Sequence, residues 1–298
     1  MEAATAKSGG YKLVRKIKDE KFDVERLHQY GLSMQVGIRD FQFCITDVET
    51  NTCLLLEDYI FEDVKTIKTR LAILSSLFEN HHLLMAGFWK SVKLSIKSHK
   101  FSLIPSSHFI EESMRDYLLL NCEINDSVED VYYYKHISSN AVNIFAADKR
   151  LVKWMRSLYP SKSLQVVHQG SALIEGILRY DDHTHEKTMF CIVDRGILHV
   201  FVSENQKLHY YNQFAVKISK DYLKYIMLVF KEFGLSQRHQ KVIVWGNIKH
   251  DSEHFELLQK YIGNISFGSK PSYLNFSFEF DEIPDHQNFD LFSVFLCD

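Results

Sequence analysis

Apolar and polar residues alternate in short runs in the region that follows Gly31, a pattern typical of half-buried β-strands. Residues 32–36 and 41–45 carry this alternation, and an apolar run at 53–56 follows a polar turn at 49–51. Because short polar turns join neighbouring antiparallel strands, this region predicts three antiparallel strands in succession.

A helix and a further strand are expected next. Five apolar residues recur at spacings of three and four and therefore share one helical face: Val64, Ile67, Leu71, Leu74 and Phe78. Residues 92–96 then alternate again, with Lys93 and Lys97 on the second face. This pattern predicts a half-exposed strand near the edge of a sheet.

The same order of elements returns about 155 residues later along the chain. Three strands are expected at 189–193, 198–202 and 208–211, followed by a helix at 222–233 and a strand at 242–245. We therefore expect an α/β protein with two lobes, each a mixed sheet flanked by helices.

This organisation predicts a flexible leader at residues 1–22, a first lobe at 23–182 and a second lobe at 183–298. The polar stretch from Asp181 to Glu186 marks the junction between the lobes. Basic residues give the leader its charge: Lys12, Arg15, Lys16, Lys18 and Lys21.

Composition narrows the classes of partner. The 298 residues include 35 Lys and Arg against 38 Asp and Glu, and this nearly balanced charge disfavours nucleic acid as a partner. No apolar run approaches the roughly 18 residues of a membrane span, so we expect no membrane association. The five cysteines are odd in number and widely spaced, which indicates reduced thiols and predicts a cytoplasmic protein.

Motifs that would name a reaction are missing. The chain contains neither a G-x-x-x-x-G-K-[ST] loop nor a G-x-S-x-G or H-E-x-x-H signature. Two histidine pairs, His183 with His185 and His250 with His254, have spacings that suit metal ligands, but no third ligand accompanies either pair. We interpret the first pair as part of a surface linker and the second as a capped helix start. The sequence predicts no metal site and no catalytic residue.

The order strand–strand–strand–helix–strand, used twice, resembles the actin-like superfamily of sugar kinases, chaperone ATPases and actin, which has a duplicated ribonuclease H-like fold. More specifically, the chain resembles an uncharacterised bacterial family of unknown function that is assigned this fold. Three stretches carry the resemblance: residues 30–43, 101–105 and 212–246. The likeness covers nearly the whole chain, and its motifs are structural rather than chemical.

The resemblance implies a nucleotide site between the lobes, formed by two phosphate-binding hairpin turns and an adenosine-binding turn. In this chain the turns fall at residues 36–41, 193–198 and 245–247, and Gln169 stands where the superfamily often places a water-orienting residue. The candidate nucleotide-binding residues carried over are Gly37, Asp194, Gly196 and Gly246.

These turns depart from the superfamily pattern, because each keeps a single glycine where functional versions crowd several. Large residues stand beside the glycines: Ile38, Phe41, Ile197 and Trp245. We therefore expect side chains to close the cleft between the lobes, and we expect neither ATP nor magnesium as a cofactor.

The leading hypothesis is a non-catalytic, pseudo-ATPase scaffold that binds an unknown partner protein or a second copy of itself. The alternative is an ATP-binding ATPase or kinase with unorthodox phosphate loops. A helix at 171–180 should cross between the lobes, with Ala172 and Gly176 on its contact face, because small side chains let two helices approach closely. Its expected partner is a helix at 252–262.

Overall fold

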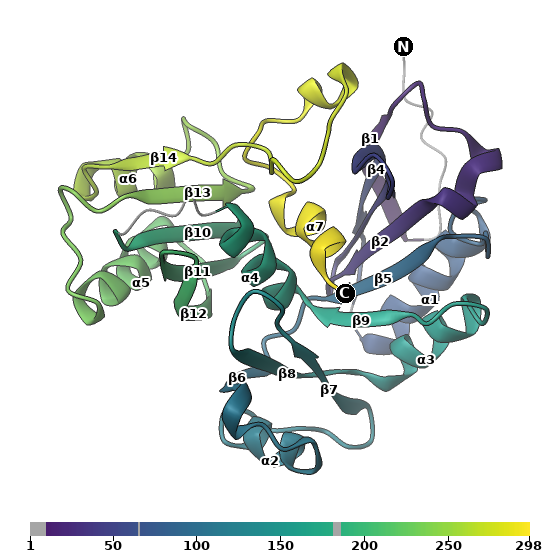
Figure 1. The fold of residues 1–298 in the computed structure, drawn as a ribbon, viewed down its shortest axis with the longest axis horizontal. Coiled ribbons are helices and arrows are strands. Elements are labelled where there is room, and N and C mark those ends of the chain that lie inside the picture. The colour runs from purple at the N-terminus through teal and green to yellow at the C-terminus, as the bar shows by residue number, and fades with distance from the viewer. Residues whose placement is uncertain (1–9, 65, 181–185) are drawn as a thin grey trace.

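The computed structural model describes residues 10–64, 66–180 and 186–298, and within these ranges the chain forms three β-sheets flanked by helices. Two larger sheets form the two lobes, and helix α4 (Gln169–Tyr180) lies between them (Figure 1). Within the same ranges, no helix is long and apolar enough to cross a lipid bilayer.

The first lobe is built on a mixed sheet with strand order β1-β4-β3-β2-β5-β9. Its first four members in this order pair antiparallel, whereas β2, β5 and β9 run parallel. The strands are β1 (Tyr11–Lys18), β2 (Tyr30–Val36), β3 (Asp40–Asp47), β4 (Thr52–Phe61), β5 (Ser91–Ile96) and β9 (Gln165–His168). Helices α1 (Ile67–Glu79) and α3 (Lys149–Leu158) bury Leu74, Phe78 and Met155 in one core with Phe41 and Phe43 of the sheet. The predicted three-stranded meander, the helix and the strand after it are therefore all present, and the structure shows that this strand pairs parallel to β2.

Two sequence expectations about this sheet are wrong. Residues 11–18 are not part of a flexible leader, because they pair along β4 as strand β1, and Ile17 is buried there. Strand β5 is an interior strand rather than an edge strand, since it lies between β2 and β9. Lys93 is buried as well, because the C-terminal segment covers its side chain, and its Nζ donates to the carbonyl oxygen of Phe295 at 2.8 Å.

The second lobe repeats this plan with strand order β12-β11-β10-β13-β14. The strands are β10 (Thr188–Asp194), β11 (Ile197–Glu204), β12 (Lys207–Ala215), β13 (Val242–Gly246) and β14 (Ile265–Phe267). Helices α5 (Ser219–Glu232) and α6 (Glu253–Tyr261) pack on one face of the sheet, with Phe230 and Phe255 in its core. Helix α4 packs on the other face through Leu173 and Ile177.

A small third sheet is inserted between β5 and β9 and lies beside the first lobe (Figure 1). It has strand order β6-β8-β7 and carries the short helix α2 (Met114–Leu119). Its strands are β6 (Phe101–Pro105), β7 (Glu129–Lys135) and β8 (Ala141–Asp148). The side chains of Leu118 and Ile144 form part of its own small core.

The end of the chain returns to the first lobe. Helix α7 (Phe289–Ser293) contacts strands β2 and β3, and Leu291 and Phe292 share a core cluster with Cys44 and Leu56. The backbone N–H of Cys53 also donates to the carbonyl of Asn275 at 2.9 Å. The expected second lobe at 183–298 is therefore wrong at its C-terminal end, because this segment completes the first-lobe core. The expected junction at 181–185 lies outside the described residues.

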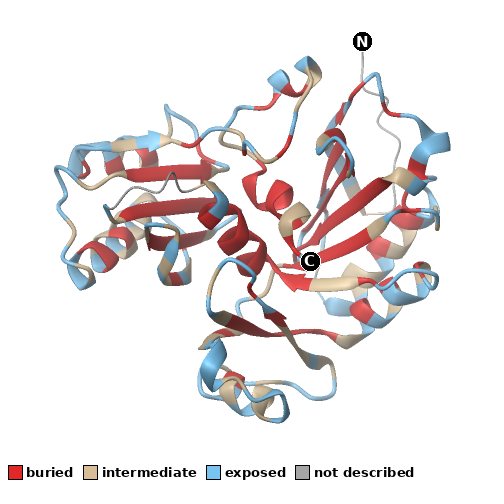
Figure 2. Ribbon diagram, viewed as in Figure 1, coloured by how far each residue is buried: buried red, intermediate tan, exposed pale blue. Residues whose placement is uncertain are grey.

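Helix α4 crosses between the lobes as expected, and it is buried along nearly its whole length (Figure 2). A Cβ placed on Gly176 would lie 2.1 Å from Oγ of Ser293, and Ala172 packs with Val294 and Cys297. The small residues thus permit a close helix contact, but the partner is α7, not the expected helix at 252–262. Helix α6 packs instead against α5.

Candidate functional site

Two hairpin turns meet between the lobes. In the turn between β2 and β3, the N–H of Gly37 donates to the carbonyl of Asp40 at 2.9 Å. In the turn between β10 and β11, Arg195 and Gly196 both have positive φ, of 44° and 88°. Two consecutive left-handed residues are the geometry of a tight two-residue hairpin, which glycine adopts freely and arginine at a cost.

The ammonium of Lys97, which follows β5, lies between two carboxylates contributed by different lobes. Its Nζ is 2.6 Å from Oδ2 of Asp40 in the first lobe and 2.8 Å from Oδ2 of Asp194 in the second. Burial by itself lowers the pKa of Lys97, but Asp194 and Asp40 together raise it above its usual value. For the acid Asp194 the effects have the opposite signs: burial raises its pKa, whereas Lys97 and the amide of Gln169 lower it to about 2. Both groups are therefore charged at neutral pH.

Arg195 makes a second connection between the lobes. Its Nη2 lies 2.7 Å from both oxygens of Asp58, and its Nη1 lies 2.8 Å from Oδ2 of Asp40. Burial alone lowers the pKa of Arg195, but Asp40 and Asp58 raise it. Because the guanidinium is planar and its N–H groups point in fixed directions, two carboxylates restrict its orientation as well as attract it.

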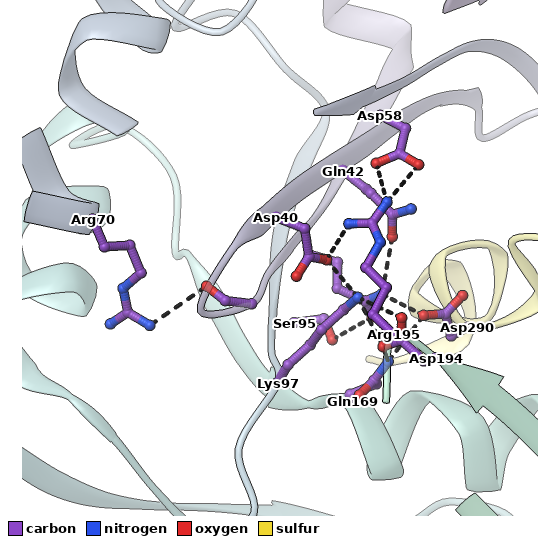
Figure 3. A network of polar contacts seen from close by, with 12 residues as sticks. Asp40, Gln42, Asp58, Arg70, Ser95, Lys97, Gln169, Asp194, Arg195 and Asp290 are labelled. Atoms are coloured by element: carbon purple, nitrogen blue, oxygen red, sulfur yellow. Dashed lines mark hydrogen bonds and ion pairs between the residues drawn. The ribbon is translucent and has the colours of Figure 1, made fainter. Parts of the chain in front are cut away.

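Amide side chains extend this network to the C-terminal helix (Figure 3). Gln169 at the start of α4 donates from Nε2 to Asp194 at 2.7 Å and to Asp290 of α7 at 2.9 Å. Gln35 of β2 also donates to Asp290, at 2.5 Å, and accepts from Oγ of Ser95 at 3.0 Å. We refer to Gln35, Asp40, Asp58, Ser95, Lys97, Gln169, Asp194, Arg195 and Asp290 as the interlobe network.

Two cavities border the interlobe network. One of about 660 Å³ is lined by Gly37 and by residues of both phosphate-type turns, and one of about 220 Å³ is lined by Gly246. Asp194 and Arg195 line both cavities, so their side chains form the wall between them.

The expectation that large side chains close the cleft between the lobes is wrong. The larger cavity remains open, and Ile38 at its edge is 63% exposed. Phe41 and Trp245 are fully buried, but they lie in hydrophobic cores rather than in the cleft. Trp245 stacks there on Phe289 of α7, with ring centroids 4.5 Å apart.

The third turn is occupied by the chain itself. The N–H of Gly246 donates to the carbonyl of His286 at 2.6 Å, and the N–H of Asn247 donates to the carbonyl of Val193 at 2.7 Å. Gly246 has a φ of 101°, and a Cβ there would lie 2.1 Å from the Val193 oxygen. This glycine is therefore explained by the close approach of two strands.

His250 and His254 form no metal site, because among the described residues no group of three or more His, Cys, Asp or Glu side chains is placed to hold an ion. His250 packs edge-on against Phe255 and Phe267, and His254 stacks on Tyr222. His183 and His185 lie outside the described residues.

Comparison with known proteins agrees with this architecture. Residues 19–265 match a family described as a protein of unknown function (DUF3822). The chain belongs to this family. No curated protein matches the chain.

Two solved structures are similar in fold. A Bacteroides thetaiotaomicron protein with actin-like ATPase fold and unknown function aligns with a TM-score of 0.78 at 21% identity, over 93% of this chain and 99% of that one. A chain of the PilM–PilN type IV pilus biogenesis complex aligns with a TM-score of 0.59 at 11% identity, over 89% of this chain and 97% of that one. This member of the family therefore has the two-lobed actin-like fold, as the resemblance predicted.

The structure brings Gly37, Asp194 and Gln169 to one cavity, so the two expected phosphate turns do face one another. Of the other two candidates, Gly246 lines the smaller cavity and Gly196 lines neither. Asp40, Asp58 and Asp290 were not expected in the site, and Lys97 was expected on an exposed lysine face. The sequence did carry a signal for Asp40 and Arg195, since both residues lie within the expected phosphate-binding turns at 36–41 and 193–198. No such signal existed for Asp290, because only the return of the C-terminal helix α7 brings this residue near Gln169.

Proposed function

We propose that this protein is a non-catalytic member of the actin-like fold that serves as an interaction module for a partner protein. The observation that carries the proposal is the position of Lys97 between Asp40 and Asp194. In the nucleotide site that the resemblance implies, Asp194 is the carboxylate that could approach a hydrated magnesium ion. A built-in ammonium that already neutralises this carboxylate removes the reason for a divalent ion to bind there.

The charge balance of the interlobe network also opposes a nucleotide. The network has two cations, Lys97 and Arg195, against the four carboxylates of Asp40, Asp58, Asp194 and Asp290. A triphosphate bound against this network would compete with its carboxylates for Lys97 and Arg195, and Arg39 is the one further arginine among the described residues that line the larger cavity. We infer from this balance that neither ATP nor magnesium is a cofactor.

Two of the glycine N–H groups that could bind a ligand in these turns are already engaged. The N–H of Gly37 is bonded within its own turn, and the N–H of Gly246 is bonded to His286. Phosphate and adenosine recognition in turns of this kind needs free N–H groups that point at the ligand. The wall formed by Asp194 and Arg195 further separates the turn of Gly37 from that of Gly246.

An interaction role is supported by a neighbour in fold. A chain of a type IV pilus biogenesis complex shares this fold, so proteins built on it do act in assemblies with other proteins. We extend this role, and nothing of the pilus process itself, to the present chain.

Thermal melting with and without millimolar Mg-ATP tests the proposal. A ligand at a hundred times its dissociation constant stabilises a protein by about 2.7 kcal/mol, which raises the melting temperature by several degrees. We expect no shift and no release of phosphate. A reproducible rise in melting temperature with Mg-ATP, absent with magnesium alone, would overturn the non-catalytic assignment.

A second candidate, an ATP-binding protein with unorthodox loops, is favoured by one observation. The larger cavity, at about 660 Å³, has the volume of a small-molecule site and is lined by both Lys97 and Arg195. These side chains would have to leave their carboxylate partners to bind phosphate. The same melting experiment decides between the two candidates.

A further inference from the structure

The larger cavity differs in character from the charged wall behind it. Three aliphatic side chains line it: Ile38, Ile60 and Ile197. Ile38 is 63% exposed and Ile60 is 36% exposed, although Ile60 belongs to strand β4 and Ile38 to the tight β2–β3 turn. Exposed aliphatic side chains that converge on a concave surface indicate a site that is covered by a ligand.

One arginine that lines the cavity is not engaged in an ion pair among the described residues. Lys97 and Arg195 are engaged with Asp40, Asp58 and Asp194, whereas the exposed Arg39 has no ion-pair partner among the residues that the structure describes. Arg39 is next to Ile38 in the turn, so the cavity presents an aliphatic surface with one available guanidinium beside it. The complementary ligand has an aliphatic group next to a carboxylate.

The geometry of the β2–β3 turn explains why the side chains of Ile38 and Arg39 are exposed. Because Gly37 closes the hairpin by donating to Asp40, residues 38 and 39 form its tip, and their side chains project from it. In the ATP-binding plan, this turn offers bare backbone to a phosphate, whereas here it offers an isoleucine and an arginine. The same place in the fold thus suits recognition of side chains rather than of phosphate oxygens.

We propose that the cavity lined by Ile38, Arg39, Ile60 and Ile197 is a docking site for a short peptide segment of a partner protein, one that carries an aliphatic residue beside an aspartate or glutamate. The aliphatic side chain enters between Ile38, Ile60 and Ile197, and the carboxylate pairs with Arg39. The inference rests on the proposed function, because a cavity that holds a nucleotide is not free for a peptide.

A selection from a phage-displayed random heptapeptide library on the full chain provides the probe. We expect the enriched peptides to share an aliphatic residue next to Asp or Glu. Synthetic copies labelled with fluorescein are then titrated by fluorescence polarisation against the parent protein and against Ile38→Asp and Arg39→Glu. Both variants should bind at least about tenfold more weakly, because each removes one half of the recognition.

Matched controls keep the test specific. Ile110→Asp alters a similarly exposed isoleucine in the inserted region of the third sheet, and Arg238→Glu reverses an exposed arginine in the loop before β13. Neither residue lines the cavity, so binding to these variants should stay within about twofold of the parent. Unchanged melting temperatures in all four variants show that the fold is retained.

The site is disproved if no peptide is enriched, if the enriched peptides lack the acidic residue, or if Ile38→Asp and Arg39→Glu bind them as tightly as the parent does. Addition of Mg-ATP judges the proposed function separately. If Mg-ATP displaces the peptide and also raises the melting temperature, the non-catalytic role is refuted. If only the peptide-binding experiments fail, the peptide site is rejected and the non-catalytic role is unaffected.

Discussion

Arg195 of the second lobe donates from one guanidinium nitrogen to both carboxylate oxygens of Asp58 in the first lobe, at 2.7 Å each. The backbone of Arg195 has a φ of 44°, a conformation that is unfavourable for a side chain of this size. The contact between the lobes is thus maintained against a local backbone cost, which indicates that the ion pair contributes to holding the lobes together.

Replacement of Arg195 should loosen this connection. In Arg195→Ala, Asp58 and Asp40 both lose a cationic partner, and we expect a loss of roughly 2–4 kcal/mol in the free energy of unfolding. Urea denaturation at pH 7 measures it. Arg115→Ala is the control, because its ion pair with Asp126 is exposed and should be worth less than about 1 kcal/mol. Equal effects of the two substitutions would argue against an interlobe role for Arg195.

Replacement of Lys97 should create a site for a divalent ion that the parent protein does not have. Lys97→Ala leaves Asp40 and Asp194 facing each other without this cation, and the expected cost is roughly 3–5 kcal/mol. Added magnesium chloride should therefore raise the melting temperature of the variant by more than that of the parent, since a divalent ion can replace the lost positive charge. Lys90→Ala, which removes an exposed lysine, controls for general salt effects. An identical magnesium response in all three proteins contradicts the view that Lys97 stands in for a metal ion.

Enlargement of Gly176 should separate α4 from α7. Its Cβ would overlap Ser293, so Gly176→Leu is expected to lower the free energy of unfolding by roughly 1–3 kcal/mol or more through overpacking. Gly87→Leu is the matched control, because nothing lies within 4 Å of a Cβ at Gly87. A second measurement uses Gly176→Ala and Ser293→Gly, each alone and combined, and the double variant should melt higher than expected from the sum of the two single effects. If Gly176→Leu melts like the parent protein, the close contact of the two helices is incorrect.

Buried neutral histidines should make the protein less stable in mild acid. Burial lowers the pKa of His168 to about 4 and that of His199 to about 3, while an unfolded histidine titrates near about 6.5. Between these values the unfolded chain binds more protons than the folded one, so the free energy of unfolding falls as the pH decreases from about 6.5 to about 4. The contacts of His168 fix its tautomer, because Nε2 donates to the Ser98 carbonyl at 2.7 Å and Nδ1 accepts from the N–H of Gly170 at 3.1 Å. A proton on Nδ1 would remove the bond from Gly170.

Urea denaturation across pH 7 to 4.5 measures this dependence. His168→Gln should lower stability at pH 7 but reduce the slope, since one of the titrating groups is gone, whereas His239→Gln, at an exposed position, should leave the slope unchanged. A slope that His168→Gln does not reduce would show that His168 does not contribute to the acid response.

Much of the secondary structure followed from the sequence because periodicity is a local property. The alternation at residues 32–36 and the helical spacing from Val64 to Phe78 each reflect one buried face, and the structure has β2 and α1 there. Strand β1, among the basic residues at 12–21, was not predicted, because it lacks such a periodic buried face. An edge strand in which Ile17 alone is buried leaves too few apolar positions to be recognised.

The sequence alone determined the order of elements, the two-lobed plan and the positions of the three turns, because these depend on residues that are neighbours along the chain. Only the tertiary structure decided what lies between the lobes. Lys97, Asp194 and Asp290 are separated by about a hundred residues or more from one another, and their meeting requires both hairpin turns and the returning helix α7. Charges so far apart in sequence carry no local signal, and their pairing depends on distances that only the packed lobes set.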